Sequence, residues 1–377
     1  MRILHTGDLH LDSAFCSTGT FGSDARRAAQ RCMLERIFEC AENEGCDMML
    51  IAGDLFDGKY VTPETAQLAL RLFSSARFPI IISPGNHDPY VSGSFYKREE
   101  LPEGVYVFNS SELQSFDFDE LGVSVIGYAF TSPVLAESPL SGAALPEKGA
   151  NARILCAHAD LSSPTSRYSP VTVGDIVRLE VDYAALGHIH NRAEDDSFGA
   201  STIRYCGFPE GRSYDEQGDG AVLIVDINKG EPVRVQRRVI SEIRYMSDTL
   251  ELDGCEQASD VRARIDAYIA GVDEPERTNL RLYLTGEAEQ DWIGDADELA
   301  RAFEGKLCSL QIKDETSPHM DGAALEKDIT LRGALYRHMR AELMSDDAAV
   351  RRRAALALKI GLAAIDGKRI PQRGADE

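Results

Sequence analysis

Short, continuous apolar runs alternate with segments of mixed polarity through the first part of the chain. The apolar runs at 2–6, 47–53 and 79–83 are typical of buried strands. The segments between them, at 24–44 and 63–77, repeat apolar residues at helical spacing and predict amphipathic helices. A strand-helix-strand-helix-strand order of this kind predicts a layered α/β domain.

Six further apolar runs follow, and their character is more β-like than that of the first part. They occupy residues 104–109, 122–130, 152–158, 183–190, 202–207 and 220–227. Their spacing predicts a second sheet that faces the first, so the fold class expected from the pattern alone is α/β with two packed sheets.

The pattern changes after about residue 240. A helix is predicted at 261–272 and a strand at 278–288, which is enough for a small α/β capping domain. The last part of the chain is mostly helical, and 350–365 combines a basic start with an apolar stripe. The chain is therefore expected to have three parts, with boundaries at 1–240, 241–322 and 323–377.

Composition narrows the class of protein only a little. The chain has 377 residues, of which 43% are hydrophobic and 27% charged, and its formal net charge is −22 at pH 7. The hydrophobic content is ample for a packed core, and so negative a charge argues against nonspecific coating of nucleic acids. A nucleic-acid enzyme remains compatible with this charge, because bound metal ions or a partner subunit can supply local positive charge.

The cysteine pattern and the N-terminal sequence indicate the expected cellular compartment. The eight cysteines are scattered and form no C-x-x-C pair, which indicates reduced thiols rather than a disulfide framework or a zinc–thiolate site. No run of 18 or more apolar residues is present, and the N-terminus does not have the pattern of a secretory signal. We therefore expect a cytoplasmic protein with no membrane partner.

Polar motifs follow several of the predicted strands directly. They are Asp8-Leu-His10, Gly53-Asp54-Leu-Phe-Asp57, Gly85-Asn86-His87-Asp88, Ala157-His158 and Gly187-His188-Ile-His190. Ligands of open α/β sheets bind outside the carboxyl ends of the strands. The five motifs are therefore expected to converge on one rim of the fold.

The residue types in these motifs indicate a metal site. Aspartate, asparagine and histidine supply oxygen and nitrogen ligands without any thiolate, a set that suits Mn²⁺, Fe²⁺ or Zn²⁺. Seven candidate ligands are too many for one ion with open positions, but they suit two ions about 3.5–4 Å apart with a bridging carboxylate. The seven are Asp8, His10, Asp54, Asn86, His158, His188 and His190.

Each motif also has an ordinary explanation when it is taken alone. A single D-x-H pair is a weak signal, and G-D-x-x-D is common in loops. Asp57 is expected to support the loop around Asp54, and His5, inside the first predicted strand, is expected to be a packed core histidine. The metal-site prediction therefore depends on the whole ordered set, in which each motif follows an apolar run.

The ordered set resembles the calcineurin-like metallophosphoesterase superfamily. The segments "ILHTGDLHLD", "IAGDLFD" and "PGNHD" resemble its DNA repair exonuclease branch, which includes the SbcD-type nuclease subunit. Residues 207–227 are similar to the YhaO-like group of that branch. The resemblance covers roughly residues 1–240 and implies a four-layer α-β-β-α sandwich; it is loose for 241–377.

The resemblance also implies a role for each motif residue. It implies two metal sites that share Asp54, with Asp8, His10 and His190 at one and Asn86, His158 and His188 at the other. His87 would face the scissile phosphate without binding metal, and Asp88 would orient the His87 ring. Two further residues, Arg212 and Tyr214, are candidates for contacts to a phosphate backbone.

The activity that the resemblance implies is hydrolysis of DNA, as a 3′-to-5′ exonuclease with single-strand endonuclease activity and two divalent ions, most favourably Mn²⁺. A phosphatase or a small-molecule or cyclic-nucleotide phosphodiesterase on the same fold is the main alternative, and the net charge of −22 mildly favours a small substrate. A metal-binding scaffold subunit is a second alternative, although such a protein would be expected to lack ligands.

The resemblance further implies a coiled-coil ABC-type (SMC-like) ATPase partner that docks on the C-terminal helices. The sequence leaves open whether the chain forms a homodimer. An amphipathic helix suits a partner groove, but it equally suits the covering of its own domain. The residues concerned are Arg351, Arg352 and Arg353 beside the stripe Ala355, Leu358, Leu362 and Ile365.

Overall fold

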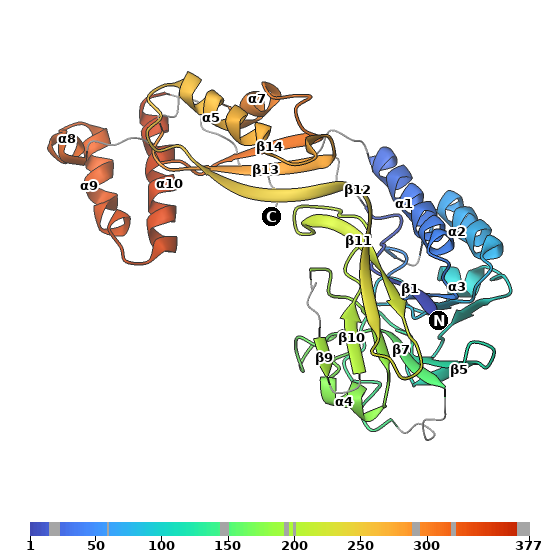
Figure 1. Ribbon diagram of the computed structural model, residues 1–377. Coiled ribbons are helices and arrows are strands. Elements are labelled where there is room, and N and C mark those ends of the chain that lie inside the picture. Colours follow the sequence, from blue (N-terminus) through green and yellow to red (C-terminus); the bar gives the residue numbers. More distant parts are fainter. Residues whose placement is uncertain are drawn as a thin grey trace. The chain divides into compact units, whose positions relative to one another are not determined.

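The computed structural model describes residues 1–14, 23–58, 60–143, 151–191, 196–198, 201–288, 295–317 and 322–367. The chain divides into two compact units, Met1–Arg244 and Tyr245–Glu377 (Figure 1). All of the residues that the sequence predicts to bind metal belong to the first unit.

The elements of the first unit follow the predicted order closely. They are β1 (Arg2–Thr6), α1 (Ser23–Asn43), β2 (Met48–Ile51), α2 (Pro63–Ser75), β3 (Ile80–Ile82), α3 (Phe95–Arg98), β4 (Val105–Val107), β5 (Gln114–Phe118), β6 (Val123–Gly127), β7 (Ala152–His158), α4 (Val173–Arg178), β8 (Tyr183–Gly187), β9 (Asp196–Phe198), β10 (Ser201–Tyr205) and β11 (Gly218–Asp226). A long strand, β12 (Arg234–Glu251), begins in this unit and continues into the second.

The strands of the first unit form two sheets. The order in one is β12-β11-β1-β2-β3-β4, and the order in the other is β5-β6-β7-β8-β10-β9. The pairs from β1 to β4 are parallel, as are those joining β6, β7, β8 and β10. Parallel strands of one sheet end on the same edge, so the loops that follow them are brought together.

Alternate residues of the central strands serve different cores, because successive side chains point to opposite faces of a sheet. Leu50 of β2 and Cys156 of β7 pack in the core between the two sheets. Ile51 packs with residues of α1, α2 and α3 on the outer face of the first sheet, and Leu155 packs with Ile176 of α4 on the outer face of the second. This arrangement confirms the predicted α-β-β-α sandwich (Figure 1).

His5 lies within β1 and is completely buried, which confirms that it is a core histidine. Its Nδ1 is 2.8 Å from the hydroxyl of Tyr183, and the two rings meet edge to face. Its Nε2 has no hydrogen-bond partner among the residues that the structure describes. Burial lowers the pKa of His5 to about 3, because charging the ring here would leave an imidazolium in an apolar core.

This histidine predicts a loss of stability in acid. The folded-state pKa of His5 lies below its ordinary value of 6.5. The contribution of the neutral ring to the free energy of unfolding is therefore fully present above pH 6.5 and is lost as the pH falls towards 3. At pH 5 the loss is about 2 kcal/mol relative to pH 7. Between pH 7 and pH 5, the free energy of unfolding of His5→Gln, measured with urea, is expected to fall by about 2 kcal/mol less than that of wild type. Equal losses in the two proteins would contradict the prediction.

The second unit has its own core, which includes Ile265, Leu280 and Leu299. Its elements after β12 are α5 (Ala258–Ala270), a 3₁₀ turn (Pro275–Arg277), β13 (Thr278–Thr285), α7 (Ala296–Arg301), β14 (Ser309–Asp314), α8 (Gly322–Lys327), α9 (Leu331–Leu343) and α10 (Ala348–Ile365). β12 neighbours β13, which pairs in parallel with β14. The prediction that residues 241–322 and residues 323–377 form two separate parts stays a prediction.

The apolar stripe of α10 is used within the second unit. Leu358 and Leu362 on this stripe are only 0% and 6% exposed. Lys359 on the same helix is also buried, and its ammonium group donates to the Asp314 carboxylate at 2.6 Å and to the Thr316 carbonyl at 2.9 Å. These contacts favour the alternative in which the helix covers its own unit. They leave little of the stripe for a partner groove.

The described cysteines are free thiols, as their scattered positions predict. Cys156 and Cys206 are among the buried ones, whereas Cys16 lies outside the described residues. Among the helices that the structure describes, none combines the length and the apolar character needed to cross a membrane.

Candidate metal centre

The loops after five parallel strands meet in the first unit, as the strand-end argument predicts. The N–H of Asp8, after β1, donates to the Gly53 carbonyl after β2 at 3.0 Å, and the N–H of His10 donates to the Asp54 carbonyl at 2.9 Å. The N–H of His188, after β8 of the other sheet, donates to the two oxygens of Asp8 at 2.9 and 3.2 Å. The centre therefore lies where the two sheets contribute strand ends to one place.

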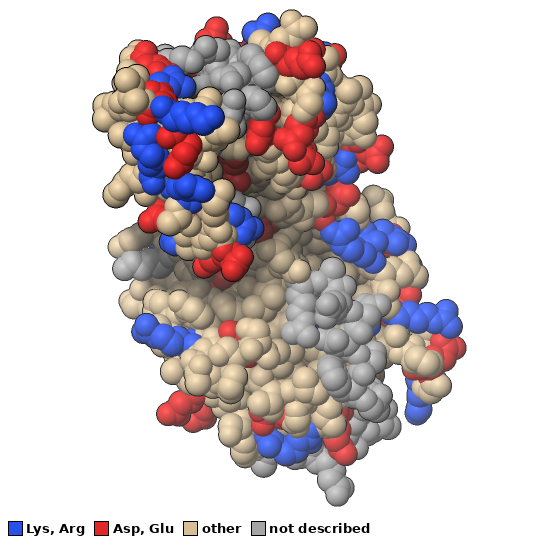
Figure 2. Space-filling model, turned by 90° about the vertical axis from the view of Figure 1, so that its left-hand side faces the viewer, with Lys and Arg blue, Asp and Glu red and all other residues tan. Residues whose placement is uncertain are grey.

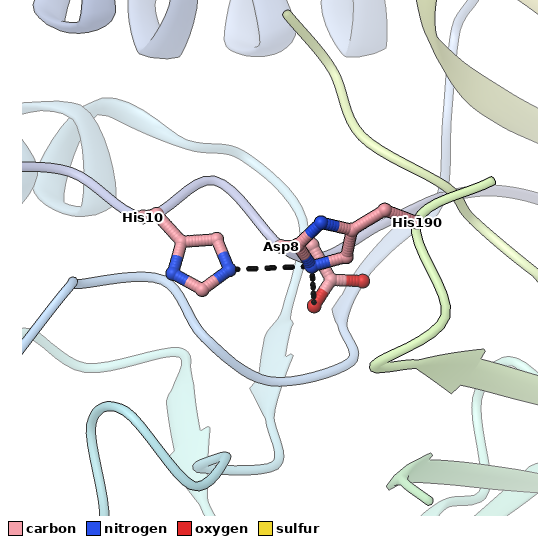
Figure 3. Close-up of side chains that lie close together, drawn as sticks. All are labelled: Asp8, His10 and His190. Atoms are coloured by element: carbon pink, nitrogen blue, oxygen red, sulfur yellow. Dashed lines mark hydrogen bonds and ion pairs between the residues drawn. The ribbon is translucent and has the colours of Figure 1, made fainter. Parts of the chain in front are cut away.

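Asp8, His10 and His190 form the first cluster of donor atoms (Figure 3). One ligand atom of each lies within 4.8 Å of the others. The Nε2 of His190 is 3.5 Å from Asp8 Oδ1 and 3.4 Å from the Nε2 of His10. Asp8 and His10 are buried, whereas His190 is partly exposed.

Asp54, Asn86 and His158 form a second cluster beside the first. The Nε2 of His158 is 3.3 Å from Asp54 Oδ2 and 2.9 Å from Asn86 Oδ1. The same Oδ2 of Asp54 is 3.7 Å from His10 Nε2, so this carboxylate lies between the two clusters. The ring of His188 is next to this cluster, with its centroid 5.0 Å from that of His158.

His87 borders the centre, and its side chain is 45% exposed. Its N–H donates to Asp54 Oδ1 at 2.9 Å, and its ring Nδ1 is 2.8 Å from Asp57 Oδ1. The same oxygen of Asp57 is 3.1 Å from His10 Nδ1, so one carboxylate oxygen serves two imidazoles. The hydrogen bond to Asp57 raises the pKa of His87. His10, Asp54 and His87 also have donor atoms within 4.8 Å of one another, which leaves a ligand role for His87 to be tested.

The prediction that Asp88 orients the His87 ring is wrong, because Asp57 occupies that place. Asp88 is buried, and one of its oxygens accepts the N–H of Gly85 at 2.8 Å. Its other oxygen accepts the N–H of Leu55 at 2.9 Å and the hydroxyl of Tyr96 at 2.6 Å. Asp88 thus ties the loop after β3 to the loop after β2. Burial, followed by the nearby Asp54 charge, raises the pKa of Asp88 to about 7.

Sequence reasoning misses Glu216, a buried carboxylate on the loop before β11. Its Oε1 is 2.7 Å from His190 Nδ1. Arg212, predicted to contact substrate, donates from its Nε to both Glu216 oxygens at 3.0 and 3.2 Å. Tyr214 lies on the same loop and is partly exposed, and its contact with substrate stays a prediction. No local signal marks Glu216 as part of the centre, since the local partner of its carboxylate is Arg212 and His190 lies 26 residues away.

The backbone at the centre adopts unusual conformations. Asp8, His10 and Asp54 have φ values of 51°, 46° and 49°, in the left-handed region that L residues enter at an energetic cost. Gly85 allows another close approach, because a Cβ at this position would lie 2.2 Å from Asp54 Oδ1. Because Gly85 has no side chain, it leaves space for the Asp54 carboxylate.

Gly85→Ala is expected to lower kcat for hydrolysis of a phosphoester, the activity that the motifs predict, by about 100-fold, because a shift of about 1 Å in a catalytic constellation has an effect of this size. The added methyl group would displace the Asp54 carboxylate, whose Oδ1 it would otherwise meet at 2.2 Å. Steady-state kinetics with Mn²⁺ measure the loss. Gly174→Ala is the matched control, since a Cβ there meets Thr172 only at 3.7 Å, and unchanged kcat in both variants would contradict the prediction.

The donor set of the second cluster fits a cation. A carbonyl oxygen can only accept, so the proton of a neutral His158 lies on Nδ1, which is 3.0 Å from the Ala52 carbonyl. Its Nε2 is then an acceptor, yet it faces the oxygens of Asn86 and Asp54 at 2.9 and 3.3 Å. Acceptors that converge without a donor between them repel one another unless a cation lies among them.

The first cluster shows the same arrangement. Asp57 and Glu216 accept from the Nδ1 atoms of His10 and His190, at 3.1 and 2.7 Å, which places the ring protons on Nδ1. When both rings are neutral, both Nε2 atoms are then acceptors, and they face each other at 3.4 Å beside the Asp8 carboxylate (Figure 3). A carboxylate on the far nitrogen of a histidine is the usual support of a metal ligand.

The buried carboxylates make positive charge favourable at both clusters. Burial alone would lower the pKa of His158, but the Asp54 and Asp8 carboxylates and the Ala52 carbonyl together outweigh it and raise this pKa to about 9. Burial likewise opposes the charge on His190, whereas hydrogen bonds to Asp8 and Glu216 raise its pKa to about 10. The surroundings thus favour a protonated imidazole or a bound divalent cation.

The fold and this donor set define a metal-dependent hydrolase. A family model described as calcineurin-like phosphoesterase matches residues 1–192, and the chain belongs to this family. The protein is therefore a metal-dependent phosphoesterase, as its motifs predict. The family uses divalent metal ions, in keeping with the groups of donors found here.

Individual relatives are similar over part of their length. The protein of Bacillus subtilis (strain 168) named uncharacterized metallophosphoesterase YhaO is 28% identical over 244 residues, which cover 61% of this chain and 58% of that protein. The SbcD component of the nuclease SbcCD from Rhodobacter capsulatus is 33% identical over 138 residues, covering 35% and 28%. The corresponding SbcD component from Bacillus subtilis is 26% identical over 305 residues, covering 64% and 70%. The chain spans less than two thirds of the first two relatives.

Proposed function

We propose that this phosphoesterase hydrolyses phosphodiester bonds of DNA, as a 3′-to-5′ exonuclease with single-strand endonuclease activity. The observation that supports this most directly is the position of the Asp54 carboxylate, 3.3 Å from His158 and 3.7 Å from His10, between two donor clusters. Such an arrangement suits two cations that share one ligand, a construction common in phosphodiester hydrolysis. The choice of DNA and the polarity follow the resemblance of the motifs to DNA repair exonucleases.

The proposed metal ligands follow the clusters, with Mn²⁺ as the preferred ion and Fe²⁺ or Zn²⁺ as alternatives. Asp8, His10 and His190 would hold one ion, Asn86, His158 and His188 the other, and Asp54 both. Bound divalent ions would offset the negative charge of the phosphate oxygens and favour ionisation of water near neutral pH.

The protein's own groups would position and protonate the substrate. The ring of His87 is partly exposed and anchored through Nδ1 on Asp57 at 2.8 Å, so its Nε2 is available to give a proton to the leaving oxygen. Arg212 lies near enough to the centre for its charge to act on His10 and His87. Its guanidinium group, held by Glu216, is suited to bind a phosphate next to the scissile bond.

A DNA substrate is supported by the relatives named as a component of the nuclease SbcCD. On the face shown in Figure 2, basic and acidic side chains are interspersed. With a net charge of −22, the chain would rely on bound cations and on a partner for attraction to DNA. We propose a coiled-coil ABC-type ATPase as that partner, docked elsewhere than on the buried stripe of α10.

A small phosphodiester, such as a cyclic nucleotide, is the second candidate substrate, and the negative charge of the chain favours it. Purified protein treated with a chelator and reloaded with Mn²⁺ would be given labelled duplex DNA, single-stranded DNA and bis(p-nitrophenyl) phosphate. Degradation of DNA from its 3′ ends is the expected result. Turnover of the small ester with intact DNA would favour the second candidate, and binding of Mn²⁺ without any turnover would indicate a scaffold subunit.

A further inference from the structure

Glu216 connects two groups that the proposed mechanism uses separately. Its side chain is only 5% exposed, and Oε1 is 2.7 Å from the Nδ1 of His190. The guanidinium group of Arg212 donates to the same carboxylate through both Nε and Nη2, and the Arg212 N–H donates to Oε2 at 2.8 Å. One buried carboxylate therefore contacts a candidate metal ligand and a candidate phosphate-binding residue.

We propose that Glu216 is the positioning residue of the centre, which keeps His190 ready to bind metal and holds Arg212 beside the substrate. The inference rests on the proposed function and names a residue that none of the sequence motifs contains. Its first part follows from proton placement: a carboxylate on Nδ1 keeps the ring proton there and leaves Nε2 as the atom that faces Asp8 at 3.5 Å.

The second part follows from the geometry of Arg212. The edge formed by its Nε and Nη2 faces Glu216, and Nη2 is also 3.5 Å from His190 Nδ1. The guanidinium group thus lies directly against the histidine that would bind metal. Its planar donors allow a second contact to a phosphate while the first edge stays on the carboxylate.

A purely structural role for Glu216 is the competing explanation, because Arg212 and Glu216 are four residues apart and could simply close their loop. The two explanations differ in what happens at the metal. If Glu216 acts through His190, its removal weakens one metal site even when the loop stays folded. If it only closes the loop, its removal acts on stability and leaves metal affinity unchanged.

The test compares four variants by calorimetric titration with Mn²⁺ alone. Glu216→Ala is expected to weaken one of the two Mn²⁺ sites by about 10- to 100-fold and to leave the other unchanged. Glu216→Gln, an uncharged acceptor of the same size, is expected to weaken the same site by about 10-fold. Arg212→Met, which keeps the contact between Glu216 and His190, is expected to change Mn²⁺ affinity little. In separate steady-state kinetics, this variant is expected to raise KM for a phosphodiester substrate.

Glu210→Gln is the matched control. Glu210 is a buried carboxylate on the same segment, but it accepts from Arg36 at 2.7 Å and from the N–H of Glu242 at 2.8 Å. This variant should bind both Mn²⁺ ions like wild type, even if it loses thermal stability. The proposal is overturned if both Glu216 variants bind Mn²⁺ like Glu210→Gln. If Glu216→Ala does not fold, the Mn²⁺ affinity of Glu216→Gln alone decides whether Glu216 acts through His190. A wild-type protein that binds no Mn²⁺ would overturn the proposed function instead.

Discussion

Asp54→Asn is expected to lower kcat/KM for phosphodiester hydrolysis by about 1000-fold, or about 4 kcal/mol of transition-state stabilisation. Oδ2 of Asp54 lies 3.3 Å from His158 and 3.7 Å from His10, one residue of each cluster. Oδ1 accepts the N–H of His87 at 2.9 Å. An amide of the same size keeps the packing but carries no charge, so both cations would lose a shared anionic ligand.

Asp12→Asn is a suitable control for this substitution. Asp12 also has a positive φ, 66°, on the loop after β1. Its carboxylate accepts from the N–H of Thr62 at 2.7 Å and from the hydroxyl of Thr65 at 2.8 Å, and Asp12 belongs to neither donor cluster. We expect the control to lower the melting temperature and to leave kcat near that of wild type. Wild-type kinetics in Asp54→Asn would show that Asp54 is not a shared ligand.

His87→Ala is expected to have a comparably large effect, a loss of about 100- to 10,000-fold in kcat with both metal sites retained. The His87 ring is anchored on Asp57 and partly exposed to solvent, which suits proton donation to a leaving oxygen. A substrate with a better leaving group, such as a nitrophenyl ester, should be affected much less, because its departure needs no proton. Loss of the ring should leave Mn²⁺ binding unchanged by calorimetry.

The structure offers a specific alternative for this histidine. His87 also belongs to a group of donors with His10 and Asp54, whose ligand atoms lie within 4.8 Å of one another. If His87→Ala lost one Mn²⁺ together with its activity, the ring would be a metal ligand and the proposed acid role would be wrong. An equal loss of kcat for DNA and for the nitrophenyl ester would also count against proton donation.

The sequence predicts the sandwich and the meeting of its motifs well, for a simple physical reason. Buried parallel strands have short, continuous apolar runs, so β1, β2 and β3 are visible without any structure. Polar residues after such strands must lie at the C-terminal edge of a sheet, which is why Asp8 and Asp54 can be placed near each other. The pattern does not reveal the long strand β12, because its exposed, charged residues give no apolar run.

Contacts made across distant loops are beyond the sequence. The motifs predict only that Asp57 supports its loop, yet it joins the rings of His10 and His87. The resemblance implies that Asp88 orients the His87 ring, although the Asp88 carboxylate is engaged by Gly85, Leu55 and Tyr96. Glu216 escapes prediction because it lies 26 residues from His190, outside the five polar motifs, and only the fold brings the two together.

The left-handed conformations of Asp8, His10 and Asp54 have an evolutionary consequence. Each costs free energy, of order 1–3 kcal/mol, which glycine would not require, so selection for stability alone opposes these residues. A descendant released from the need to hydrolyse esters should therefore replace them early, with glycine or asparagine favoured. Retention of all three in a lineage would then indicate continued selection for chemistry, and their loss would mark a protein kept for assembly alone.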